Sequence, residues 1–180
     1  MQMQGQRNIN ASRDAVWRAL NDPEVLKACI PGCDELEKTS GTSFEASVVQ
    51  KVGPMKVRFK GSVELSDIVK AESYTITGEG KGGAAGFAKG GAKVHLSDDG
   101  DGTLLVYEAE AKVGGKMAQL GSRLIDGFAR KLADEFFTRF QEVVEGPAEE
   151  PSGEPEAEDD TPEEKKKGWF RRLISWIGRA

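Results

Sequence analysis

The chain has 180 residues and a formal net charge of −5, which is unevenly distributed. Residues 146–164 contain nine acids and no base, residues 165–180 contain six bases and no acid, and residues 1–145 therefore carry only −2. This length predicts one domain with short extra segments, and the near neutrality of that domain argues against nucleic acid as its partner. The first ten residues are polar and no apolar run reaches about 18 residues, so we expect a cytoplasmic chain with neither a signal peptide nor a membrane-spanning helix.

The N-terminal part predicts a strand followed by two short helices. Residues 5–10 suit an opening strand. Ser12 is a good helix N-cap, and Asp14 in the first turn suits the helix dipole. Asp22 and Pro23 end this helix and begin a second one over residues 24–29, because proline fits the first helical turn.

Between residues 33 and 113 the apolar residues alternate with polar ones, which is typical of strands. The clearest run is residues 55–65, where Met55, Val57, Phe59, Gly61, Val63 and Leu65 share one face. Further strands are expected near residues 44–49, 73–79, 92–96 and 103–113, joined by short turns. This pattern predicts an antiparallel meander with one solvated face and one dry face.

The dry face needs a cover, and residues 116–144 are the only segment long enough to provide it. Apolar residues recur there at three- and four-residue steps, from Met117 to Phe140, which predicts one long helix. Asp126 is expected on its solvated face, Gly121 inside its apolar stripe, and Phe137 off the stripe as a possible contact with another chain. The predicted fold class is α+β, a curved antiparallel sheet around a long C-terminal helix.

Two glycines on the facing surfaces, Gly61 and Gly121, suggest an apolar cavity between sheet and helix. Glycine also permits close packing, so the residues leave both interpretations open. The glycine-rich run 78–91 lacks the ending of a phosphate-binding loop and does not lead into a helix. It predicts a flexible hairpin or a mobile loop at the cavity mouth. The candidate cavity residues are Val57, Phe59, Gly61, Val63, Tyr74, Ile76, Phe87, Tyr107, Leu120, Gly121, Leu124 and Phe128.

Conventional catalytic and metal-binding sets are absent from the sequence. The one histidine, His95, lies between Val94 and Leu96 in a predicted strand and is expected on the opposite face from them. Cys29 and Cys33 would need another pair of ligands to form a zinc site, so we predict no metal. The acids suit solvated faces, so a paired-carboxylate mechanism has no visible support.

The C-terminal segments predict a tether and a membrane-binding helix. Residues 146–164 form an acidic, proline-rich segment typical of a disordered linker. Residues 165–180 place aromatic and aliphatic residues on one helical arc and basic residues on the other, as in helices that lie in a membrane interface. A groove on a protein is the alternative target. The predicted membrane-binding residues are Lys165, Lys166, Lys167, Trp169, Phe170, Arg171, Arg172, Leu173, Ile174, Trp176 and Ile177.

Several short motifs resemble the CoxG-like proteins, the carbon monoxide dehydrogenase accessory family within the SRPBCC, or START-like, superfamily. They are Ile30-Pro31-Gly32-Cys33, Val52-Gly53-Pro54, Phe59-Lys60-Gly61, the run 78–87 and Gly121-Ser122-Arg123-Leu124-Ile125. The resemblance covers about residues 1–144.

This resemblance implies a helix-grip fold with a hydrophobic cavity over residues 1–145. It also implies an accessory role beside an aerobic molybdenum-containing CO dehydrogenase or a related molybdenum hydroxylase, with membrane recruitment and handling of a quinone. We therefore expect a non-enzymatic protein at the cytoplasmic face of the membrane, with no intrinsic cofactor and a bound quinone or similar isoprenoid lipid. A helix-grip enzyme and a purely structural adaptor with a filled core are the alternatives.

Overall fold

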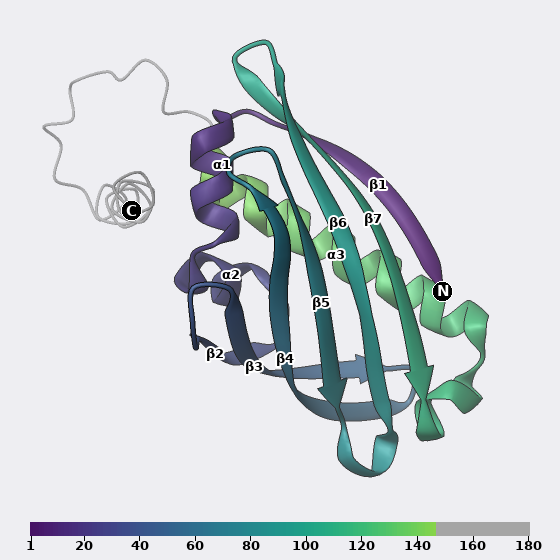
Figure 1. Ribbon diagram of the computed structural model, residues 1–180. Coiled ribbons are helices and arrows are strands. Elements are labelled where there is room, and N and C mark those ends of the chain that lie inside the picture. Colours follow the sequence, from purple (N-terminus) through teal and green to yellow (C-terminus); the bar gives the residue numbers. More distant parts are fainter. Residues whose placement is uncertain (147–180) are drawn as a thin grey trace, which may run out of the picture.

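A computed structural model describes residues 1–146 and shows a seven-stranded antiparallel sheet curved around one long helix (Figure 1). The strand order is β1-β7-β6-β5-β4-β3-β2, so the first strand pairs with the last one at one edge. The strands are β1 (Gln2–Ile9), β2 (Cys33–Lys38), β3 (Ser43–Val52), β4 (Met55–Val69), β5 (Ser73–Lys81), β6 (Phe87–Asp99) and β7 (Gly102–Gly114). The helices are α1 (Arg13–Leu20), α2 (Pro23–Cys29) and α3 (Ser122–Glu145), with 3₁₀ helices η1 (Gly83–Ala85) and η2 (Gly115–Leu120). The predicted α+β fold, a curved antiparallel sheet with a long C-terminal helix, is confirmed.

The two short helices begin where their capping residues predict. The Ser12 hydroxyl accepts a hydrogen bond from the Ala15 amide at 3.2 Å, and the Asp22 carboxylate accepts one from the Glu24 amide at 2.9 Å. Pro23 occupies the first turn of α2. Each cap satisfies a backbone donor that the helix itself leaves unpaired.

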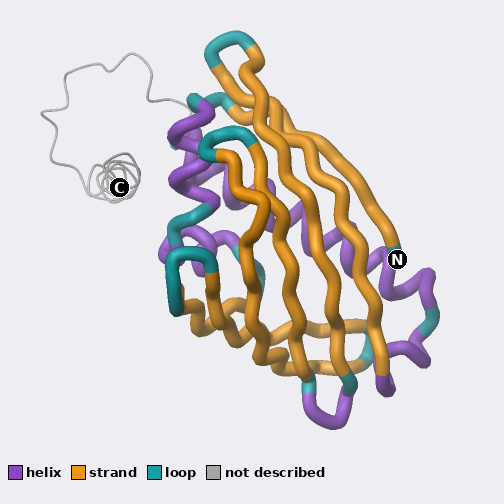
Figure 2. Tube along the Cα trace, in the orientation of Figure 1, coloured by secondary structure: helices purple, strands orange, loops and turns teal. Residues whose placement is uncertain are grey.

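The strand connections divide the sheet into two ends (Figure 2). One end holds the connections 53–54, 82–86 and 115–121, and we call it the mouth end. The other holds the connections 39–42, 70–72 and 100–101 together with α1, and we call it the helical end. The chain alternates between them because each neighbouring pair of strands is antiparallel.

The main core lies toward the helical end. It joins α1, α2 and the second half of α3 to inward side chains of the sheet, and its largest fully buried members are Phe140, Ile9, Leu96 and Leu105. β1 also holds α3 from the side, because the Arg7 guanidinium lies 2.6 Å from the Asp134 carboxylate and over the Phe137 ring. This end of the helix is therefore fixed to the sheet.

Three sequence predictions about this fold were wrong in detail. The helix does not run from residue 116: residues 115–120 form η2, and α3 begins at Ser122. Gly121 is therefore not inside an α-helical stripe but joins the two helices at a φ of +96°, a backbone conformation that favours glycine. The run 78–91 does form one of the two predicted structures, a hairpin, in which only residues 82–86 lie outside β5 and β6. Phe137 is buried rather than free for another chain.

The prediction for His95 is confirmed, whereas those for the C-terminal segments concern residues that the structure does not describe. Val94 and Leu96 are buried and His95 is exposed, as their alternation predicts. Residues 147–180, which include nearly all of the predicted linker and the whole membrane-binding segment, lie outside the described residues. Within residues 1–146, no helix is both long and apolar enough to cross a membrane.

Candidate functional site

The first half of α3 covers the sheet without being buried by it. None of residues 122–135 is buried, whereas Phe137, Phe140, Val143 and Val144 in the second half are. The difference is not one of hydrophobicity, because Ile125, Phe128 and Leu132 continue the same apolar stripe. Their side chains are half-buried, and Leu124 retains 37% of its accessible surface.

The facing surface of the sheet carries small residues. They occupy inward positions along the middle strands, alternate with outward charged or polar residues, and are only half-buried: Gly61, Gly78, Gly80, Ala88, Gly90, Ala92, Ala109 and Ala111. These facing residues of helix and sheet thus lack the full burial of the main core, although Gly78, Gly90, Ala92, Ala109 and Ala111 also line a hollow on the outward face. We call the space between residues 122–135 and these small residues the groove.

The inner end of the groove meets the main core. Four of the predicted cavity residues belong to that core or pack against it: Val63, Tyr74, Ile76 and Tyr107. The Tyr74 ring meets Trp17 edge-on at 5.3 Å between centroids, and the Tyr107 ring stacks on Phe137 at 5.2 Å. These residues close the groove rather than line an empty chamber.

Other predicted cavity residues gather at the mouth end. Leu120 and Leu124 lie beside Gly53 in the β3–β4 turn, within 4 Å of where a Cβ of that glycine would be. Val57 and Phe59 lie in the same way beside Gly82. Val57 is buried together with Val52 and Met117, outside the main core. Phe128 is half-buried between the two regions.

Phe87 is placed differently from the other cavity candidates. It pairs with Lys81 across β5 and β6 and lies against Gly114, so it shares the outward face of Lys81. It keeps 39% of its surface exposed. Phe87 therefore marks the rim of the mouth end and does not point into the groove.

The glycines that suggested a cavity have different roles. A Cβ on Gly61 would overlap the backbone oxygen of Glu79, so this glycine allows close strand packing. Its neighbour Gly80 leaves room, because a Cβ there would lie 3.7 Å from the nearest atom, Phe59 Cβ. Gly121 has open space around it, and its positive φ explains its presence.

One polar residue of α3 was missed by the sequence reasoning. Asp126 was assigned to the solvated face, yet its Oδ1 atom is buried and is the one such side-chain oxygen or nitrogen without a hydrogen-bond partner in residues 1–146. A buried acceptor left unpaired costs about 1–3 kcal/mol. The atom has almost no accessible surface, so a ligand that donates a hydrogen bond there would recover this cost only after neighbouring side chains move. No pattern in the sequence signals this burial, because Asp126 falls among the polar positions of the helix.

Ionisable groups near the core are held in their neutral forms by burial. Burial raises the pKa of the Tyr74 hydroxyl above its ordinary value. It also raises the pKa of the Cys29 thiol to about 12, with Arg139 opposing and Glu142 reinforcing the shift. No cluster of His, Cys, Asp or Glu within residues 1–146 could hold a metal ion. The residues around the groove therefore favour binding of an apolar ligand over catalysis by charged groups.

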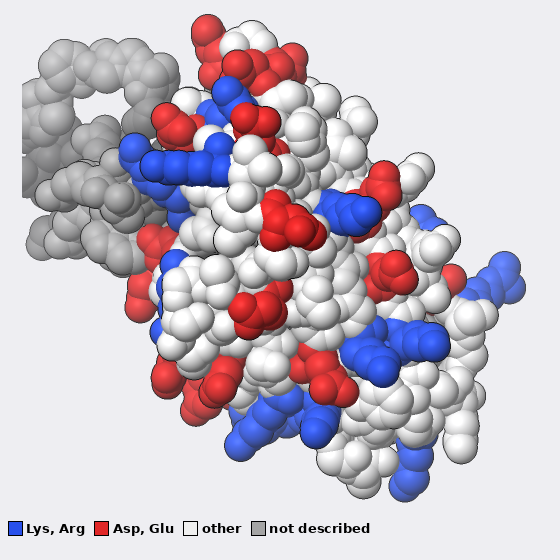
Figure 3. Space-filling view, in the orientation of Figure 1, with Lys and Arg blue, Asp and Glu red and all other residues white. Residues whose placement is uncertain are grey.

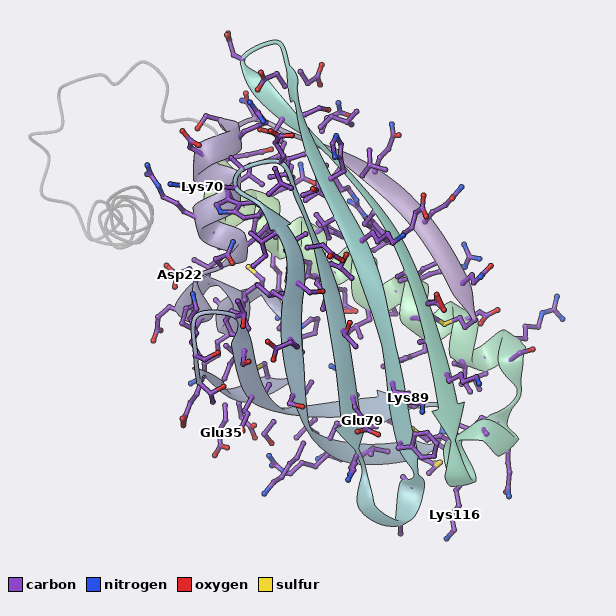
Figure 4. The ribbon with its side chains drawn as sticks, in the orientation of Figure 1. Asp22, Glu35, Lys70, Glu79, Lys89 and Lys116 are labelled. Atoms are coloured by element: carbon purple, nitrogen blue, oxygen red, sulfur yellow. The ribbon has the colours of Figure 1, made fainter. Side chains whose placement is uncertain are left out.

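A second hollow, of about 1270 Å³, crosses the outward face of the sheet from β1 to β3. Its outward side chains are mostly polar and of both charges, among them Glu45, Glu64, Glu79, Lys89 and Lys93, and its lining also includes apolar residues such as Phe44, Val63 and Ile76. Figure 4 shows Glu79 and Lys89 on neighbouring strands of this face. Such a surface does not suit an apolar ligand, since buried charges would lose their solvation.

Comparisons with known proteins identify the family and the fold. The sequence model of the family described as the carbon monoxide dehydrogenase subunit CoxG matches residues 5–145. A conserved protein from Geobacillus kaustophilus has a similar structure, with 29% identity, a TM-score of 0.74, and coverage of 79% of this chain and 93% of that one.

More distant structures share the fold alone. A Chromobacterium violaceum protein has 15% identity and a TM-score of 0.61 over 81% of this chain and 99% of its own. A Thermus thermophilus protein has 18% identity and the same TM-score over 79% and 95%. A comparison with curated proteins gave no significant match.

Proposed function

The chain belongs to the CoxG family of carbon monoxide dehydrogenase subunits, and from that premise we propose that it carries an apolar, quinone-like lipid in the groove. The family suggests an accessory role for CO dehydrogenase. In the proposed role the chain brings a molybdenum-containing CO dehydrogenase, or a related hydroxylase, to the membrane and assists electron delivery to quinone. The redox chemistry belongs to the partner enzyme, and this chain binds and positions the acceptor.

The observation that carries the proposal is the unburied first half of α3. Its apolar residues face small residues of the sheet, so the groove provides apolar surface without filling it. Burying apolar surface contributes roughly 25 cal/mol per Å², which favours a ligand with a long hydrocarbon part. A chain with a closely packed helix and sheet would lack this site.

Asp126 supplies a feature that suits the head of such a ligand. The reduced form of a quinone carries hydroxyl groups, and an unpaired carboxylate oxygen accepts a hydrogen bond from a hydroxyl. The quinone form offers only carbonyl acceptors. We therefore expect Asp126 to favour the reduced form, and Asp126→Asn or Asp126→Leu to reduce that preference.

Extraction of the purified full chain with organic solvent, followed by mass spectrometry, tests ligand binding. Copurified quinone, or uptake of added quinone, is expected. A matched pair of variants locates the site. Ala109→Phe places a ring on the inward side of β7 and should abolish uptake, whereas Glu110→Phe places it on the outward side and should not. If quinone neither copurifies with the wild-type chain nor is taken up by it, the proposal fails and the chain is a purely structural adaptor.

Membrane recruitment is proposed from the sequence of residues 165–180. Deleting these residues should abolish cosedimentation with anionic vesicles, because the deletion removes six basic residues and the apolar arc. Deleting residues 147–164 instead would keep that segment and should preserve binding. Binding that survives the first deletion unchanged would place membrane recruitment elsewhere.

A further inference from the structure

Lysines face one another across the strands at the mouth end. Three cross-strand pairs are both lysine: Lys51 with Lys56, Lys60 with Lys81, and Lys89 with Lys112. Like charges directly opposite each other destabilise a sheet. The three ion pairs within residues 1–146 all involve arginine, so none of them neutralises these lysines. Glu79 is the other neighbour of Lys89 but forms no salt bridge with it.

Exposed apolar side chains lie among these lysines. Phe87 pairs with Lys81 and begins the strand that carries Lys89. Leu124 lies beside the β3–β4 turn, and Lys51 and Lys56 form the second residue pair from that turn. These are two of the four large hydrophobic residues exposed in residues 1–146, and the other two, Ile68 and Val69, precede the β4–β5 turn.

Acidic residues gather at one turn of the opposite end of the sheet. The β6–β7 turn is flanked by Asp98, Asp99 and Asp101. In Figure 3 acidic side chains crowd the upper tip, and basic ones lie along the lower right of the visible face. Lys116, in η2, extends from the lower end in Figure 4. The mouth end is thus basic with apolar tips, whereas the helical end carries charges of both signs, including Arg13 and Lys70.

We propose that the mouth end docks directly on an anionic lipid membrane, with Phe87 and Leu124 entering the interface and the lysines on lipid phosphates. Lipid phosphates would neutralise the lysine pairs that the sheet leaves opposed. A position that breaks a local stability rule in this way is expected at a functional surface. Docking would open the groove toward the bilayer, so a lipid ligand could enter it without crossing water. Only that last consequence rests on the proposed function.

The C-terminal segments match this surface less well than a membrane does. Residues 147–164 carry negative charge but no large apolar residue to cover Phe87 and Leu124. Residues 165–180 carry apolar residues but are basic, and the lysines would repel them. A second copy of the mouth end would be repelled in the same way. An anionic bilayer offers both negative charge and an apolar interior.

Hydrogen exchange of the full chain on vesicles tests the proposal, because it separates docking of the domain from binding by the C-terminal segment. On vesicles of phosphatidylcholine with phosphatidylglycerol, peptides covering residues 82–87 and 115–124 should become protected. Vesicles of phosphatidylcholine alone should give little protection. Protection at residues 165–180 alone would overturn the proposal, as would protection of the mouth end only by an added protein partner.

Charge reversal provides the decisive variant. In Lys81→Glu/Lys112→Glu, each new glutamate faces a remaining lysine, so the fold should be preserved. Each basic residue near an anionic surface contributes about fivefold in affinity, so mouth-end protection should be lost. The control Lys27→Glu/Lys70→Glu changes the net charge by the same amount at exposed positions away from the mouth end, and the mouth end should remain protected in it. Protection that survives in the first variant would contradict the proposal. Quinone uptake in detergent should be equal in both variants, which distinguishes this test from that of the proposed function.

Discussion

Replacing either of two paired glycines, Gly61 or Gly80, with alanine should change stability in opposite directions. Gly61 and Gly80 are direct cross-strand partners, and both are at inward positions of the groove. A Cβ on Gly61 would overlap the backbone oxygen of Glu79, whereas a Cβ on Gly80 would lie 3.7 and 3.8 Å from two atoms of Phe59. Neither glycine has a positive φ, so steric space alone separates the two substitutions.

The expected magnitudes follow from this difference. Gly80→Ala should raise the free energy of unfolding by about 0.4–1 kcal/mol, because alanine reduces the freedom of the unfolded chain and its methyl group fits. Gly61→Ala should lower it by about 1–3 kcal/mol, because the strands must shift to admit the methyl group.

Urea denaturation followed by circular dichroism measures both effects, with the free energy taken by linear extrapolation. The denaturant slope should stay constant if both variants keep the native fold. Wild-type stability in Gly61→Ala would refute the close-packing role of this glycine. A destabilised Gly80→Ala would show that the groove has no room for a methyl group.

Three further predictions concern charge, thiol reactivity and pH. Lys81→Glu should raise the free energy of unfolding by about 0.2–1 kcal/mol, because it replaces repulsion from Lys60 with attraction. Thermal unfolding should show this increase most clearly at low salt, and an unchanged stability would disprove the repulsion. Iodoacetamide at pH 8 should label Cys33 before Cys29, whose raised pKa of about 12 leaves almost no thiolate; equal labelling of the folded chain would contradict the burial of Cys29. Because the pKa of Tyr74 is raised in the folded chain, only the unfolded chain ionises this residue near pH 10, so stability should fall above that pH. Tyr74→Phe should reduce the fall. An identical pH profile in the variant would contradict the role of Tyr74.

Local signals were sufficient for most of the fold. The alternation in residues 55–65 gave the inward face of β4, where Val57 and Leu65 are buried. Ser12 and Asp22 marked the helix starts because a cap acts within its own turn. The alternation around His95 gave its outward direction without any knowledge of its neighbours.

Features that depend on contacts between elements were not predictable. Met117 and Leu120 share a side in a 3₁₀ helix as well as in an α-helix, so their spacing did not reveal the break at Gly121. Phe137 is buried because β1 and β7 reach around α3, which widens the buried arc beyond one stripe.

The lysine pairs show the same limit for the sheet. Lys60 and Lys81 are separated in sequence, and only the register of β4 and β5 brings them opposite each other. The sequence shows merely that lysines occur on outward positions. Register also determines that Phe87 shares their face, which the sequence interpretation of Phe87 as a cavity-mouth residue did not include.

Photolabelling with a quinone that bears a diazirine on its isoprenoid chain tests the account most directly. The label should map to residues 122–135 of α3 and to inward residues of β4 and β7. It should be lost in Ala109→Phe and retained in Glu110→Phe. Labelling confined to the outward face of the sheet or to residues 165–180 would contradict a ligand-binding groove between sheet and helix.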